Sequence, residues 1–68
     1  MRAIIVFYRK GDTSYPMTNN VKEDQLRHEL DTLKQNGHTV LMVLHLSSVI
    51  QVRRIEFLGK EPAEEEKK

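Results

Sequence analysis

Two apolar segments constrain the fold of this chain most strongly. Residues 2–9, RAIIVFYR, and residues 38–46, HTVLMVLHL, are rich in β-branched and other apolar side chains, which predicts two strands. Neighbouring side chains of a strand point to opposite faces, so strands that are apolar at both odd and even positions need cover on both faces. A chain of 68 residues without cysteine must provide that cover without disulfides, because so short a chain has only a marginal core.

The segment between the two strands has the pattern of a helix, predicted over residues 21–36. A narrow stripe recurs at near-helical spacing and consists of Val21, Leu26, Leu30 and Leu33. Asn20 followed by Glu23 predicts a capping box at the start of the helix. Gly37 predicts its end, because glycine adopts a left-handed conformation without a Cβ clash.

The remaining segments complete an α+β domain of β-α-β-β order, with a three-stranded sheet and one helix on one face. Residues 10–20, KGDTSYPMTNN, combine turn-forming residues and predict a loop. Residues 49–58 predict the third strand. Residues 60–68, KEPAEEEKK, lack apolar periodicity and predict a disordered charged tail after a single domain over residues 1–59.

Two strand orders fit this pattern. In the favoured order, the most apolar strand, 39–46, lies between strands 2–9 and 49–58, because the polar content of 49–58 suits a sheet edge. In the alternative order, strand 49–58 lies between the other two.

The adjacent Arg53 and Arg54 interrupt the apolar alternation of the third strand. The apolar phase slips by one residue across this pair, and a β-bulge would restore one continuous apolar face. The residues of that face would be Ile50, Val52, Ile55 and Phe57. We therefore predict a bulge at the arginines, with both guanidinium groups on the solvent side together with Gln51 and Glu56.

A single helix covers only one face of the predicted sheet, and the other face needs a different cover. We expect a homodimer that forms through this open sheet face or through an edge strand, because contiguous exposed apolar patches usually mark an interface. In the alternative, the loop over residues 10–20 folds back as a lid made of Tyr15, Pro16 and Met17.

The sequence offers no catalytic constellation. Cysteine is absent, and no G-x-S-x-G, Walker loop or G-x-G-x-x-G occurs. The three histidines, His28, His38 and His45, lack metal-ligand spacing. We therefore expect no catalytic, metal or cofactor site, and no enzyme. The longest apolar runs are too short to span a membrane, so we expect a cytoplasmic protein without a membrane partner.

The candidate binding residues are the basic ones near the strand ends, with one aromatic side chain. They are Arg9, Lys10, Tyr15, Arg53 and Arg54. The sequence favours a small non-enzymatic, dimeric regulatory protein that binds an unidentified protein partner. The alternative is a nucleic-acid-binding dimer, in which Arg9, Lys10, Arg53 and Arg54 form a basic rim and a tyrosine stacks on a base.

Overall fold

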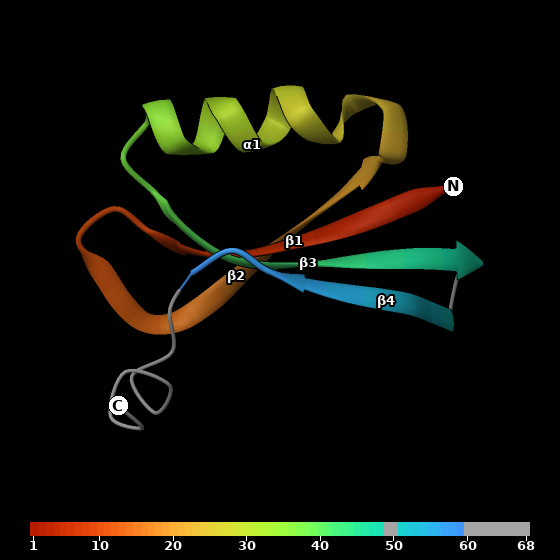
Figure 1. Ribbon diagram of the computed structural model, residues 1–68. Helices are drawn as coiled ribbons and strands as arrows, with labels where there is room; N and C mark the ends of the chain where they lie inside the picture. The colour runs from red at the N-terminus through yellow and green to blue at the C-terminus, as the bar shows by residue number, and fades with distance from the viewer. Residues whose placement is uncertain (49–50, 60–68) are drawn as a thin grey trace, which may run out of the picture.

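A computed structural model describes residues 1–48 and 51–59, which form an antiparallel four-stranded sheet with α1 on one face (Figure 1). The elements are β1 (Arg2–Arg9), β2 (Asp12–Lys22), the 3-10 turn η1 (Glu23–Gln25), α1 (Leu26–Gln35), β3 (Thr39–Ser48) and β4 (Gln51–Phe57). The predicted α+β class with one helix on one face is confirmed. The prediction of three strands is wrong, and the predicted tail, residues 60–68, lies outside the described residues.

The segment predicted as a loop, residues 10–20, forms most of the additional strand, β2. Gly11 takes a φ of 75° in the tight turn after β1, which explains why glycine stands there. β2 then pairs with β1 from Phe7↔Met17 to Arg2↔Lys22. Pro16 is compatible with this strand because β2 lies at the sheet edge, where a missing amide hydrogen is tolerated.

The alternative of a lid over the open face is also wrong. Met17 packs against the core between α1 and the sheet, and Tyr15 is exposed. Between Phe7 and Arg9, two steps along β1 correspond to five along β2, so this part of the hairpin is irregular. The irregularity lies in the β1–β2 ladder itself and not in a segment that covers the sheet.

The strand order is β2-β1-β3-β4. This confirms the favoured order, in which strand 39–46, now β3, lies between strand 2–9 (β1) and strand 49–58 (β4). β1 and β3 are antiparallel neighbours. Because β2 reverses the chain before α1, the connection through α1 joins β2 to β3 and crosses over β1. β4 lies at the sheet edge, as its polar content predicts.

The helical segment is shorter than predicted and begins differently. α1 spans Leu26–Gln35 and follows the 3-10 turn η1, and neither element has a side-chain N-cap hydrogen bond, so the predicted capping box is wrong. The predicted end is confirmed: Gly37 has a φ of 88°, and its amide donates to the carbonyl of Lys34.

The main core lies between α1 and the covered face of the sheet. Its buried members are Ala3, Ile5, Phe7, Val21, Leu33, Val40 and Val43, with Met17, Leu26 and Leu30 packed against them. The predicted helical stripe thus faces the core. Ile5 and Val43 are register partners on the central strands, and both are fully buried.

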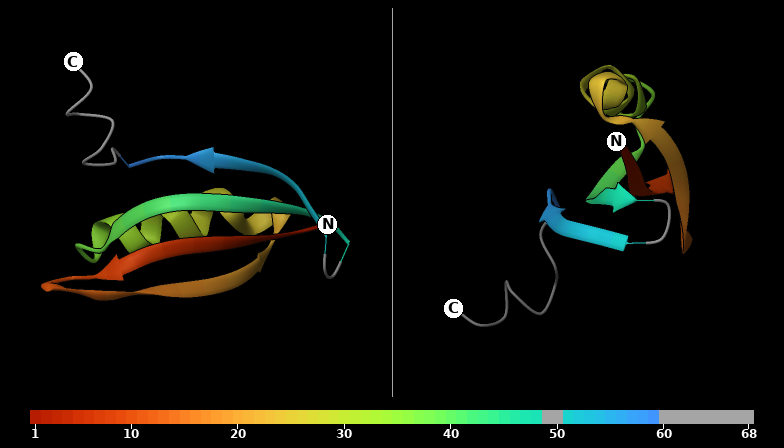
Figure 2. Two further views of the ribbon diagram at one scale, coloured as in Figure 1. Left: turned by 90° about the horizontal axis from the view of Figure 1, so that it is seen from below. Right: turned by 90° about the vertical axis from the view of Figure 1, so that its right-hand side faces the viewer.

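No helix of residues 1–48 and 51–59 lies over the opposite face of the sheet (Figure 2). The ladders align Ile4 with Leu44 and Ile55, and they align Val6 with Met42 and Phe57. We call the apolar set on this face the open-face strip, which consists of Ile4, Val6, Met42, Leu44, Val52, Ile55 and Phe57. Its three β4 members are 47–56% exposed.

Candidate functional site

The two arginines lie at a β-bulge in β4, and this confirms the bulge predicted there. His45 pairs with Arg54 and the next residue of β3, Leu46, pairs with Val52, so Arg53 is the extra residue. The bulge keeps Val52, Ile55 and Phe57 on one face, as predicted; Ile50 lies outside the described residues.

The orientation of β4 differs from the prediction. Its apolar residues belong to the open face and are exposed, whereas Arg54 and Glu56 pair with His45 and Val43 on the side of the sheet that carries α1. The predicted separation of arginines from apolar residues is therefore right. The expectation that only the polar residues of β4 face solvent is wrong, because every residue of β4 is exposed.

His45 on β3 is the buried polar residue among the described residues, with 3% of its surface exposed. Its Nδ1 lies 2.6 Å from Glu23 Oε2, and its Nε2 lies 3.2 Å from Glu56 Oε1. The two carboxylates come from η1 and β4, so the imidazole ring joins three elements of the fold. Burial of the ring is possible because both nitrogens have partners.

The two arginines each contact one of the carboxylates that flank this ring. Arg53 Nη2 lies 3.6 Å from Glu23 Oε2, and Arg54 Nη1 lies 3.9 Å from Glu56 Oε1. We call these five residues, Glu23, His45, Arg53, Arg54 and Glu56, the His45 network. The His45 network was not predicted from the sequence, because Glu23 was interpreted as a helix cap and the arginines as free surface charges.

The electrostatic effect of the network is visible at Glu23. The hydrogen bond with His45 lowers the pKa of the Glu23 carboxyl. Desolvation raises this pKa by less than the hydrogen bond lowers it, and the positive charges of His45, Arg53 and Arg54 lower it further. Glu23 is therefore held as a carboxylate. The two ring nitrogens point at different carboxylates, so the ring is a bridge between them and not a free base.

The remaining candidate binding residues lie elsewhere. Arg9 pairs with Asp12 beside the β1–β2 turn, whereas Arg54 pairs with His45, which is opposite Ala3. Six residues of strand separate Ala3 from Arg9, which corresponds to about 20 Å. The predicted convergence of the basic residues on one rim is therefore wrong.

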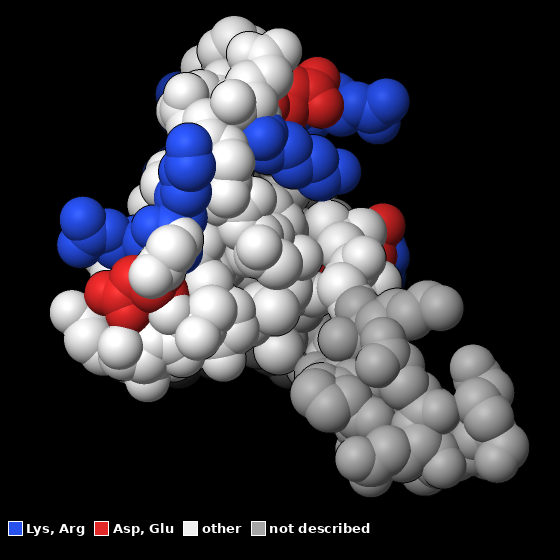
Figure 3. Space-filling model, turned by 90° about the vertical axis from the view of Figure 1, so that its left-hand side faces the viewer, with Lys and Arg blue, Asp and Glu red and all other residues white. Residues whose placement is uncertain are grey.

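The end of the molecule with the β1–β2 turn has its own local contacts. The backbone amide of Lys10 donates to His38 Nδ1. Asp12 Oδ1 accepts hydrogen bonds from the amide and hydroxyl of Ser14, which lower the pKa of the Asp12 carboxyl. Figure 3 views the molecule from this end and shows basic groups, some adjacent and others apart, in an otherwise largely uncharged surface. Such a distribution differs from the continuous basic footprint typical of nucleic-acid binders.

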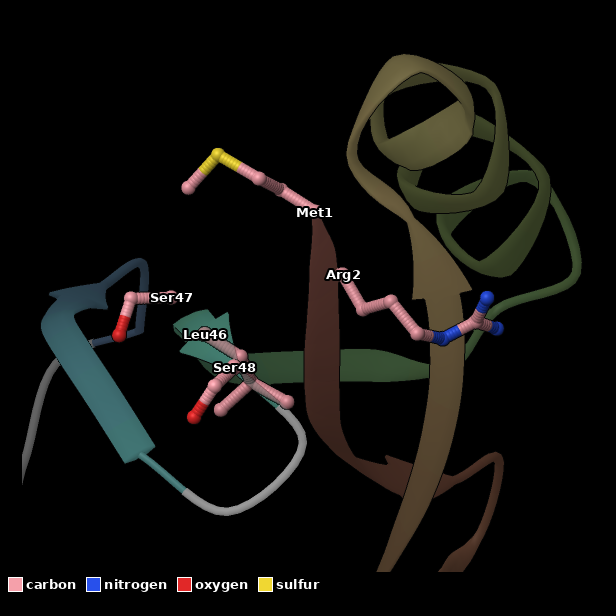
Figure 4. A pocket seen from close by; sticks show the side chains of 5 residues that line it. All are labelled: Met1, Arg2, Leu46, Ser47 and Ser48. Atoms are coloured by element: carbon pink, nitrogen blue, oxygen red, sulfur yellow. The ribbon is translucent and has the colours of Figure 1, made fainter.

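A hollow of about 240 Å³ lies at the opposite end of the sheet and is lined by Met1, Arg2, Leu46, Ser47 and Ser48 (Figure 4). The Arg2 side chain points away from the hollow, toward β2, and its Nε donates to Asn20 Oδ1. The lining therefore offers serine hydroxyls and apolar groups, without a carboxylate, a histidine or a free guanidinium.

Within residues 1–48 and 51–59, no group of three or more His, Cys, Asp or Glu side chains is placed to hold a metal ion. No helix in the described part of the chain has the length and apolar character needed to cross a membrane. No protein-family model, curated protein or solved structure matches the chain.

Proposed function

We propose that this protein is a small non-enzymatic binding protein that acts as a homodimer, in which the open-face strips of two copies pack against each other. The observation that carries this proposal is the half-exposed row Val52, Ile55 and Phe57 beside Leu44 and other apolar residues of a sheet face that no helix of the described residues covers. Contiguous patches of this kind are uncommon on monomers and usually mark an interface.

The surroundings of the strip support a second copy of the chain as its occupant. On the same face, β2 contributes Thr18 and Asn20, which are the register partners of Val6 and Ile4. Arg2 also lies at this border and binds Asn20. An apolar centre with a polar border is the usual anatomy of a protein interface. A two-fold axis through the strip would bring each apolar centre onto the other and leave both borders in water.

The dimensions of the face fit a weak dimer. Four strands about 4.8 Å apart, with about seven residues of about 3.3 Å each, give a projected face of about 450 Å². Accessible surface exceeds projected area, and a standard interface buries about 800 Å² per partner. The open face therefore lies near the lower end of the range for specific interfaces.

The energetics lead to the same expectation. Full burial of a large apolar side chain contributes about 1.5–3 kcal/mol, so completing the burial of three half-exposed residues contributes roughly 2–4 kcal/mol per copy. Two copies together gain about 4–8 kcal/mol from these residues, which does no more than offset the estimated association cost of about 4–15 kcal/mol. Burial of these three residues alone therefore does not give a tight dimer, and we expect a weak one that forms at high micromolar concentration.

Sedimentation equilibrium of the wild type and two variants tests the proposal. Ile55→Lys places a charge within the strip, and Gln51→Lys places the same charge elsewhere on the same exposed strand. We expect the wild type and Gln51→Lys to self-associate at high micromolar concentration and Ile55→Lys to remain monomeric. A monomeric wild type throughout this range, or equal association of both variants, would contradict the proposal.

Binding of a separate protein partner by the dimer stays a prediction without an assigned surface. The nucleic-acid alternative is tested by retention on heparin at low salt, which a protein that neutralises phosphates shows and which falls steeply with salt. We expect no such retention, because Arg53 and Arg54 lie beside carboxylates and far from Arg9 and Lys10.

A further inference from the structure

The exposed edge strand β4 is held to the rest of the fold by its ladder and by polar side chains. All its residues are exposed, and it forms a ladder with β3 alone. Beyond that ladder, two polar side-chain contacts link β4 to other elements, Glu56 with His45 of β3 and Arg53 with Glu23 of η1. The buried end of this connection is His45, and the rest is partly or largely in water. A small polar network therefore helps to fix β4, in addition to its ladder and the apolar pairs that it forms with β3 on the open face.

We propose that the His45 network is a pH-sensitive latch, which fixes β4 against η1 when the imidazole ring carries two protons and loosens β4 when it carries one. A doubly protonated ring donates one hydrogen bond from Nδ1 to Glu23 and one from Nε2 to Glu56. A neutral ring has a single N–H group. One of its nitrogens then presents a lone pair to a carboxylate, which is repulsive.

Among the charged groups of the network, His45 is the one whose protonation determines whether the latch is closed. Glu23 faces the ring from η1, and Glu56, with Arg53 and Arg54 near the two carboxylates, approaches from β4. From β1 the register partner of His45 is the uncharged Ala3. Arginines keep their charge throughout the physiological range, and carboxylates are ionised above the acid range, whereas histidine is the side chain that changes charge between pH 5 and 8.

Of the two carboxylate contacts, the Glu56 contact is expected to open first. The distance from Nδ1 to Glu23 is 2.6 Å, whereas that from Nε2 to Glu56 is 3.2 Å, and Glu56 is the more exposed of the two carboxylates. A single remaining proton therefore favours Glu23. Loss of the Glu56 contact loosens β4, which is then held by its ladder with β3 and by the Arg53–Glu23 ion pair, and leaves η1 attached to β3.

β4 also carries three residues of the open-face strip, so the latch would regulate the proposed dimer. This consequence rests on the proposed function, whereas the latch itself is a property of the monomer. The test is therefore made at low micromolar concentration, where self-association does not contribute.

The experiment is amide hydrogen exchange of β4, corrected for intrinsic exchange rates, at about pH 5.5 and about pH 8, on either side of histidine titration. We expect protection of the β4 amides to be about tenfold lower at the higher pH, the effect of losing one charge-assisted hydrogen bond. Amides of β1 should keep their protection ratio, because β1 is held by two ladders and the core. Corrected β4 protection that is the same at both pH values would overturn the latch.

Two variants separate the latch from general effects of pH. Glu56→Gln supplies an amide that accepts from Nε2–H or donates to a bare Nε2, so β4 protection should become independent of pH. His28→Gln, at an exposed position of α1, should keep the wild-type dependence. Retention of that dependence in Glu56→Gln, or its loss in His28→Gln, would refute the proposal. Nitrogen-15 chemical shifts of the His45 ring give an independent readout, with both nitrogens protonated at the lower pH.

Discussion

Ile4 and Ile5 are neighbours on β1, but they lie on opposite faces of the sheet, so the same substitution should act differently at each. Ile5 is fully buried between the central strands and α1, with Val43 as its register partner. Ile4 is half-buried and belongs to the open-face strip. The pair therefore compares the covered face and the open face within one strand.

The magnitudes follow from burial. Ile5→Ala leaves a cavity flanked by two central strands that have little freedom to collapse into it, and we expect a loss of about 3–4 kcal/mol in the free energy of unfolding. For a domain of this size that corresponds to roughly 12–30 °C in Tm, a large part of the total stability. Ile4→Ala removes a side chain that is already partly in water, and we expect a loss of about 1 kcal/mol or less for the monomer.

The assay is urea unfolding of the wild type and both variants at a low and a high micromolar protein concentration. A homodimer makes stability depend on concentration. We expect Ile4→Ala to reduce this dependence, and Ile5→Ala to lower stability at both concentrations by a similar amount. If Ile4→Ala is the more destabilising variant at the low concentration, the assignment of the two faces is refuted.

Three further predictions concern the bulge, acid stability and the first turn. Deletion of Arg53 should remove the register shift between His45 and Leu46 and preserve the faces of β4, so the unfolding free energy should change by no more than about 1 kcal/mol, because a ladder pair replaces a surface ion pair. Loss of the fold in urea unfolding would contradict the bulge. The pKa of Glu23 in the folded state is lowered from 4.5, so the ionised side chain stabilises the fold above pH 4.5. This stabilisation is lost as the pH falls through the lower pKa of the folded state. An acid titration followed by circular dichroism should therefore show a smaller loss of stability in Glu23→Gln than in the wild type. Gly11→Ala should cost about 1 kcal/mol by thermal melting, because Gly11 has a φ of 75° and open space around its Cα, so backbone strain is the only penalty; an unchanged Tm would contradict the observed turn.

The parts of the fold that apolar burial determines were predictable from the sequence. The helical stripe, with Leu30 and Leu33, shows the period of its packing against the core, and Gly37 marks where the helix ends. The bulge at Arg53 was predictable for the same reason: a phase slip in an apolar alternation has few structural solutions.

The strand β2 was not predictable by the same reasoning. It lies at an edge and is held by backbone hydrogen bonds to β1, which do not require β-branched side chains, and its apolar contribution to the core consists of Met17 and Val21. The residues Pro16, Asn19 and Asn20 favour a loop locally, but pairing with β1 overrides this preference. Because this strand reverses the chain once more before α1, β1 and β3 are antiparallel neighbours.

The His45 network was missed because its members have ordinary local explanations. An acidic residue early in a helical segment suits the helix dipole, so Glu23 needed no partner from β3. Only the register of β3 against β4, together with the position of η1, brings Glu23, His45 and Glu56 together. These positions are 22 and 11 residues apart in sequence from His45, without a local signal.

The proposal that two copies meet through the open-face strip is tested most directly by amide and methyl NMR spectra recorded over a dilution series. We predict that concentration-dependent shifts map to β1, β3 and β4 residues of the strip, with Ile4, Leu44 and Ile55 among the largest, while the exposed side of α1 stays unchanged. Shifts confined to α1 or to the β1–β2 turn, or spectra that do not change with concentration, would contradict it.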